Sequence, residues 1–307
     1  MAVINTGLLT KGLRSEFLDR FDSTTTFYRD LATRIQSTSD TETYKWLGSL
    51  PRMREWGTGR LAKGLGSESY SVENLKYEST LEVDRDEIAD DKTGQVRIRI
   101  GELAARAATH KDYLISQLLI NGETSGFNSY DGVSFFNDAH VSGSSGSQDN
   151  LLIADAADPD NATTDEFKTA LKSAIGAMLG FKDDQAEPMS ISATGLVCVV
   201  PTMMFLTASE AVNATMVSST SNVLAGAARV IALPWLTDQS KWYLMKTDAV
   251  IRPFIFQDRE PVEFTALTED SDEGFRREKL LYGVRARYRI AYGYWQYAVR
   301  VNFTTPV

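Results

Sequence analysis

The sequence is poor in the residue types that most often build metal centres, redox sites and covalent cross-links. Its 307 residues include one cysteine, Cys198, and two histidines, His110 and His140. A single cysteine excludes an internal disulfide and most zinc sites, and a reducing compartment fits this composition. Cys198 lies among valines and is expected to be inert core. His110 lies in a helical pattern and is expected to be a polar residue on a helix face.

Long apolar runs and phosphate-binding motifs are also missing. No window of about 18 consecutive apolar residues occurs, so no membrane span is predicted. The first residues lack the apolar stretch and cleavage site of a signal peptide. The string "GTGRLA" at 57–62 neither follows a strand nor opens a helix, so no dinucleotide site is predicted. The net charge of -9 argues against a dedicated nucleic-acid binder, although it leaves room for a basic patch.

The best candidate for chemistry is a loop-like segment that contains Asp131, Asp138 and His140. A metal site there needs further ligands that the sequence does not identify. Acidic runs elsewhere, such as "DRDEIADD", are typical of solvated faces. We therefore predict no catalytic residue, no metal, no cofactor and no enzyme. A soluble hydrolase with a carboxylate or metal site stays as an alternative, in which Asp138→Ala would abolish activity.

Apolar periodicity predicts an α+β chain with a long helix near its middle. Apolar residues recur at three and four positions through 93–121, with Asp90 or Asp91 near the helix N-terminus and Gly122 as its C-cap. Strands dominate the last third of the sequence.

Local signals mark three further elements. Thr163 and Glu166 form a capping box ahead of a second helix that ends at Gly180. The run Leu196 to Val200 predicts a buried strand, and Pro201 occupies the first-turn position of a third helix.

The first 92 residues look unsuited to a monomer. Leu13, Phe17 and Phe21 are spaced by four, but a Ser- and Thr-rich stretch follows. We expect an arm that is ordered only by contact with something else, not a core segment. From about Trp56 to Glu78 the pattern predicts a two-stranded excursion with a glycine-rich centre, and such a ribbon is marginal in water alone.

One late strand has an arginine face. Alternation from Tyr282 to Ile290 places apolar residues on one side and Arg285, Arg287 and Arg289 on the other. These arginines can meet an acidic segment of a neighbouring copy or the phosphates of DNA, and we prefer the neighbour. Such features are typical of a subunit whose partners are copies of itself. Assembly that is indifferent to salt would count against charged interfaces.

The order of several segments resembles the Mu-like major head subunit family, which has the Hong Kong 97 capsid fold. The specific stretches are "TYKWLGSLPRMREW" (43–56), "SVENLKYESTLEVDRDEIADD" (71–91), "YDGVSFFNDAH" (130–140), "WYLMKTDAVIRPFIFQDREP" (242–261) and "YGVRARYRIAYGYWQYA" (282–298). The resemblance implies an N-terminal arm at 1–45 and an extended E-loop with flanking segments at 46–92. It also implies a peripheral domain at 93–193 and 269–307, with a spine helix at 93–121, and an axial domain at 194–268.

The resemblance further implies a structural major capsid protein. It would self-assemble as pentamers and hexamers into an icosahedral shell around a phage genome, localised to the virion and assembled in the bacterial host cytoplasm. Expected partners are copies of itself, a scaffold or protease, a portal, decoration proteins, and packaged double-stranded DNA contacted non-specifically; no membrane is expected. A same-fold cellular nanocompartment shell is the alternative. The predicted inter-subunit contacts are Trp56, Gly57, Gly59, Arg60, Lys63, Gly64, Gly66, Arg285, Arg287 and Arg289.

Overall fold

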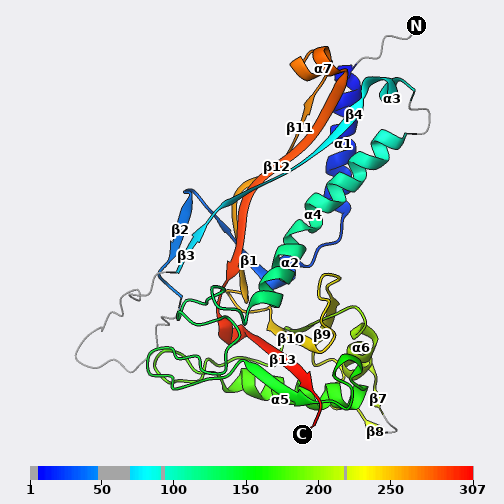
Figure 1. Ribbon diagram of the computed structural model, residues 1–307. Coiled ribbons are helices and arrows are strands. Elements are labelled where there is room, and N and C mark those ends of the chain that lie inside the picture. Colours follow the sequence, from blue (N-terminus) through cyan, green and yellow to red (C-terminus); the bar gives the residue numbers. More distant parts are fainter. Residues whose placement is uncertain (1–5, 48–69, 91–93, 218–219, 307) are drawn as a thin grey trace.

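The computed structural model describes residues 6–47, 70–90, 94–217 and 220–306. A long, narrow sheet with two helices along it forms one part, and a second sheet with its own helices forms a wider part at one end (Figure 1). The described chain is α+β, as predicted. No helix in these ranges is long and apolar enough to cross a membrane.

The long sheet has four strands in the order β1-β11-β12-β4. Strands β11 and β12 form an antiparallel hairpin, β4 pairs antiparallel with β12, and β1 pairs parallel with β11. Their bounds are β1 Ala32–Gln36, β4 Leu75–Asp84, β11 Phe254–Leu267 and β12 Lys279–Tyr292. The β11–β12 register shifts between Asp258 and Glu263, around Pro261, which has no N–H to donate to the ladder.

Strand β12 alternates as its sequence predicts. Tyr282, Val284, Ala286, Tyr288 and Ile290 are all buried, and the arginines between them are exposed or half-buried. Strands β3 and β4 correct the expectation of an excursion that has no partner surface in its own chain. Residues 70–78 do not lack a partner, because β3 (Tyr70–Glu73) pairs with β2 (Thr41–Tyr44) and β4 pairs with β12 of the same chain.

The long helix α4, Gln95–Asn121, confirms the strongest helix prediction. It starts after Gly94, which has a φ of 71°, and Asp90 instead follows the short helix α3, Arg85–Ala89. Gly122 stands at the C-cap, as predicted, with a right-handed φ of -63° in place of the left-handed conformation that is common at helix ends. A Cβ on Gly122 would lie 2.6 Å from the Phe136 ring, and close packing is therefore what requires glycine there.

The first helix corrects the expectation of an arm outside the core. Helix α1, Thr6–Ser23, lies along α4, and both Leu13 and Phe17 are buried. The Phe17 ring lies 5.0 Å from the Phe264 ring of β11, in a second apolar cluster between α1, α4 and the long sheet. The four-residue spacing thus forms an apolar stripe that this chain itself covers. After α2, Tyr28–Leu31, the chain enters the long sheet as β1.

The wider part contains a five-stranded sheet in the order β5-β13-β10-β6-β9. Their bounds are β5 Leu151–Asp155, β6 Leu196–Val200, β9 Arg229–Ala232, β10 Lys241–Lys246 and β13 Ala298–Thr304. Helix α5, Thr164–Gly180, has the predicted capping box and packs on this sheet. Helix α6, Phe205–Asn213, begins four residues after Pro201, because a turn at 202–204 intervenes.

Non-local strand pairing divides the chain differently from the predicted boundaries. Strand β11 lies in the predicted axial segment but belongs to the long sheet, whereas β5 and β13 come from the predicted peripheral segment and pair with the strands around β10. Periodicity identifies strands but not their distant partners. The remaining elements are β7 Met216–Val217, β8 Thr220–Ser221, α7 Asp272–Arg277 and the 3-10 turns Pro159–Asn161 and Trp295–Tyr297.

Candidate assembly surfaces

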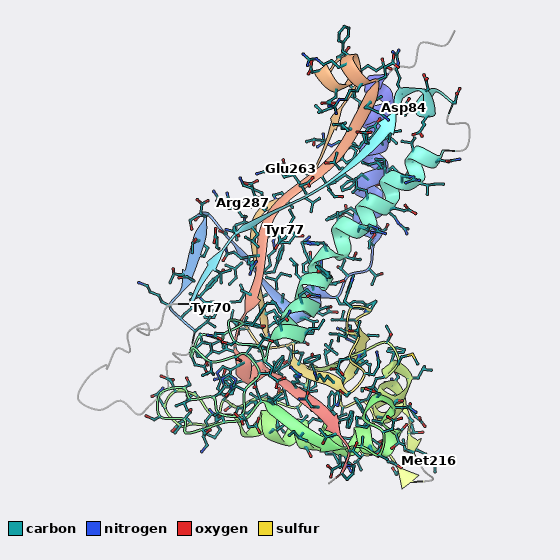
Figure 2. All side chains as sticks on the ribbon, viewed as in Figure 1. Tyr70, Tyr77, Asp84, Met216, Glu263 and Arg287 are labelled. Atoms are coloured by element: carbon teal, nitrogen blue, oxygen red, sulfur yellow. The ribbon has the colours of Figure 1, made fainter. Side chains whose placement is uncertain are left out.

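The arginine face of β12 has acidic partners within its own chain. Arg285 contacts Glu260 at 2.6 Å, and Arg287 contacts Asp40 at 2.5 Å and Glu260 at 3.9 Å. The Arg287 guanidinium holds the pKa of the Asp40 carboxyl below its ordinary value. Arg287 lies about midway along the long strands (Figure 2). Ion pairs with an exposed carboxylate contribute little to stability, because solvent screens them. An inter-subunit role for the three arginines therefore stays a prediction.

The other predicted contact residues fall on one segment. Trp56, Gly57, Gly59, Arg60, Lys63, Gly64 and Gly66 all lie outside the described residues. Their role in contacts between subunits also stays a prediction.

The histidine and carboxylate cluster is packed as core. His140 is fully buried, and its Nδ1 lies 2.6 Å from Asp131 Oδ2. Its Nε2 lies 3.2 Å from the Phe135 carbonyl, and its ring stacks on Trp295 at 4.1 Å. Asp138 is exposed, and within the described ranges no three His, Cys, Asp or Glu side chains converge as a metal site. Because both ring nitrogens have partners, His140 holds its loop against the segment that precedes β13 and offers no free nitrogen to a metal.

The two other chemically distinctive residues also have structural surroundings. Cys198 is fully buried in β6, and burial raises the pKa of its thiol to about 12. The predicted burial of Cys198 is confirmed, and its inertness stays a prediction. His110 Nδ1 lies 2.7 Å from the Tyr288 hydroxyl, and its half-buried position lowers the pKa of its imidazole.

A cationic, aromatic cleft was missed by sequence reasoning. It has a volume of 540 Å³ and lies where α2, β1, α4 and β11 meet. Lys111 of α4 is 5% exposed, and burial lowers the pKa of its ammonium to about 8. Its Nζ lies 5.1–5.5 Å from four ring centroids, those of Phe21, Tyr28, Phe256 and Tyr288. The available signal was a lysine on the buried stripe of α4, seven residues after Ala104 and four before Ile115.

Large apolar side chains are exposed at opposite ends of the molecule. Phe275 of α7 is 87% exposed at the tip of the β11–β12 hairpin. At the far end of the wider part, near α6 and β7, Met203, Leu206, Met216 and Val223 are also exposed. Figure 2 places Met216 at this end. An exposed apolar side chain of this size is most often covered by a partner when it stands in such a group.

Solved capsid structures share this arrangement of two sheets and a long helix. The subunit of the bacteriophage JBD30 procapsid matches all of this chain and 77% of its own, with a TM-score of 0.60 and 23% identity. The capsid of cyanophage P-SCSP1u matches 92% of this chain and 89% of its own, with a TM-score of 0.59 and 12% identity. The virus-like particle of Pyrococcus furiosus matches 95% and 98%, with a TM-score of 0.55 and 13% identity. The fold is the Hong Kong 97-type capsid fold.

Sequence comparison then identifies the family. The model of the family described as "Mu-like prophage major head subunit gpT" matches residues 7–164, 161–236 and 237–304, so the chain belongs to this family. It is 25% identical to the Mu-like prophage FluMu major head subunit of Haemophilus influenzae, over 95% of this chain and 71% of that protein. It is 26% identical to the major capsid protein of Escherichia phage Mu, over 94% and 70%. The predicted structural major head protein is confirmed.

Proposed function

We propose that this chain assembles with copies of itself, as pentamers and hexamers, into the icosahedral shell that encloses a phage genome. The observation that supports this most is the family match, which extends over both sheets and the long helix. The mature shell would belong to the virion and would be assembled in the bacterial host cytoplasm. A same-fold nanocompartment has no comparable support, because the Pyrococcus furiosus particle is 13% identical and shows the fold alone.

The two sheets suggest which part of the chain forms the peripheral domain and which forms the axial domain of the shell subunit. We assign the peripheral domain to the long sheet with α1 and α4, and the axial domain to the five-stranded sheet with α5 and α6. The exposed apolar group near α6 then has a partner, since copies would meet there around the five-fold and six-fold axes. Many modest contacts of this kind add up by multivalency while each remains reversible during assembly.

Residues 46–92 are proposed as the E-loop with its flanking segments, and the excursion from about Trp56 to Glu78 would extend across a neighbouring subunit. The glycines at 57, 59, 64 and 66 would let one sequence fit both pentamers and hexamers. Replacing them with proline should leave a folded protomer and prevent closed shells. Normal shells from such a variant would refute this role.

Further partners are proposed from the same function. A scaffold or protease would act during assembly, a portal would occupy one vertex, and decoration proteins could bind the outer surface. The inner wall would contact packaged double-stranded DNA non-specifically, which an acidic protein can tolerate without a dedicated binding site.

The first test is to express the chain alone and examine it by size-exclusion chromatography and negative-stain electron microscopy. Closed shells, or rings of five and six, support the proposal. A monomer of 34.0 kDa calls for repeating the experiment with the neighbouring head proteins present. A discrete dimer or tetramer that stays small even then would refute it.

A further inference from the structure

The buried ammonium of Lys111 lacks an acceptor within the described chain. No described carboxylate or carbonyl lies within hydrogen-bonding distance of Nζ, and the four rings around it supply only cation–π attraction. Of the nearby carboxylates, Asp112 accepts from the backbone of Phe27 and Tyr28, and Asp258 pairs with Arg34 at 2.6 Å. A buried charge without a hydrogen-bonded partner is costly, and the arrangement therefore favours an acceptor that comes from outside.

The cleft beside Lys111 indicates the chemistry of that acceptor. Four cationic side chains and a single carboxylate line it: Lys111, Arg29, Arg34, Arg252 and Asp258. The Nε of Arg29 donates to a neutral phenol, the hydroxyl of Tyr28, at 3.3 Å. A cleft of 540 Å³ is much larger than one small anion and is of the size that encloses several side chains. With rings in its wall, it suits a peptide segment that carries both carboxylates and an aromatic ring.

The tip of the β11–β12 hairpin is such a segment. Residues 268–278 contain five carboxylates and two arginines, with Phe275 among them. Asp270 has no ion pair in the described chain, and Asp272 and Glu273 pair only with arginines four residues later in the same short helix. Phe275 is 87% exposed, and no described residue of its own protomer covers it. Residues 268–278 therefore form a knob that presents carboxylates and an aromatic ring, and the described part of its own chain leaves that ring uncovered.

The knob and the cleft cannot meet within one chain. Asp258 of the cleft and Leu267, where β11 ends, are nine residues apart on one strand, which corresponds to about 30 Å. Figure 1 shows α7 at the end of the long sheet that is remote from α2 and the start of β11. A contact between them must join two copies. Because the surfaces differ, it is a heterologous contact, which repeats from copy to copy and builds rings or shells.

We propose that the α7 tip of one copy docks into the Lys111 cleft of a neighbouring copy, with Phe275 among the rings and a tip carboxylate on the Lys111 ammonium. The proposal rests on the proposed function and names one of its interfaces. Arg276, which follows Phe275 on the tip and has a 73% exposed side chain, then lies close across the interface to Val250 on the cleft wall, which is 94% exposed.

Disulfide trapping in assembled shells tests this contact. The double variant Arg276→Cys, Val250→Cys, which retains Phe275, is assembled with the accompanying head proteins, oxidised, and run on a denaturing gel. We expect a ladder of linked subunits. The matched control pairs Arg276→Cys with Ile153→Cys, which is 71% exposed on β5, and is expected to give no ladder. Native Cys198 is fully buried and does not interfere.

Assembly measurements on single variants add an energetic readout. Phe275→Ala and Lys111→Met should each raise the concentration required for half-maximal assembly at least about tenfold. The double variant should be no worse than either single variant, because both remove the same contact. Ile153→Ala is the control and should leave assembly unchanged.

The outcomes separate this contact from the proposed function. A ladder specific to the Arg276–Val250 pair, with non-additive effects of Phe275→Ala and Lys111→Met, supports the docking. Normal shells without that ladder overturn the docking and leave the shell function standing. Failure of the wild-type chain to form any shell or ring under the same conditions overturns both.

Discussion

Replacing Lys111 with methionine should stabilise the unassembled chain near neutral pH and flatten the pH dependence of its stability. Methionine retains an unbranched, polarisable side chain within the aromatic cage but removes the buried charge. Burial lowers the pKa of Lys111 from an ordinary 10.5 to about 8. Between these values the unfolded chain binds more protons than the folded chain. The free energy of unfolding of the wild type therefore rises with pH in this window.

The magnitude follows from the two pKa values. A difference between 10.5 and about 8 corresponds to a cost of about 3 kcal/mol at pH 7, where lysine is charged in both states. Most of this cost disappears by pH 10. The stability advantage of Lys111→Met over wild type should thus shrink by about 2–3 kcal/mol between pH 7 and pH 10. The charged and titratable groups that face the ammonium are the same in both proteins: Tyr28, Arg29, Arg34, Asp112, Asp258 and Tyr288.

Urea denaturation of the unassembled chain, followed by tryptophan fluorescence at pH 7, 8, 9 and 10, measures this difference. Urea is uncharged and leaves the electrostatic balance intact. Tyrosines whose pKa is raised by burial weaken both proteins equally at the highest pH, so their effect cancels in the comparison. Lys172→Met, at an exposed site on α5, is the control and should stay within about 0.5 kcal/mol of wild type. A wild-type-to-Lys111→Met difference that does not change with pH would refute the unpaired buried ammonium.

Three further predictions concern the protomer and are measured by the same denaturation assay. Gly122→Ala should destabilise by about 1–3 kcal/mol, because its Cβ would meet an aromatic ring at 2.6 Å; Gly176→Ala, with open space around it in α5, should instead stabilise by about 0.5–1 kcal/mol. Thr163→Ala should cost about 1 kcal/mol by removing the α5 capping box, and no loss would contradict that role. Asp131→Ala should cost about 3–5 kcal/mol, since it leaves its buried histidine partner unpaired. The exposed neighbour variant Asp138→Ala should change stability by less than about 0.5 kcal/mol.

Local patterns predicted the elements whose structure depends on local contacts. The α5 capping box and the alternation of β12 both follow from residues a few positions apart, and both are confirmed. The start of α6 was placed too early at Pro201, because a proline fits a turn as well as a first helical turn. Such local patterns do not predict which strands belong to the same sheet. The pairing of β5 with β13 joins residues nearly 150 positions apart, and nothing in either strand's alternation specifies its partner.

The same limit explains why the arginine face was easier to identify than its partners. Alternation alone places Arg285 and Arg287 on one side of a strand, but Asp40 reaches Arg287 only because β2 and β3 bring the first part of the chain across the long sheet. Charge composition had pointed to a neighbouring copy, since an acidic chain offers many partners. The fold supplies two of them internally, and these contacts must be broken or shared before either arginine can serve an interface.

Lys111 shows that a site can be visible in the sequence only as a residue that departs from the expected helix pattern. A lysine on the buried stripe of α4 violates the helix pattern, and such violations most often mark either a snorkelling side chain or a functional position. Only the fold distinguishes the two, because the rings that enclose the ammonium come from α1, α2, β11 and β12. Lys111 is 5% exposed, and its ammonium ends among those rings at the wall of the cleft instead of at the outer surface of the helix. The charge therefore lies largely buried at the wall of a cleft that carries three guanidinium groups, and it has lost part of its hydration. A carboxylate from a second copy offsets that cost only on assembly, so the same residue that weakens the free chain would favour the shell.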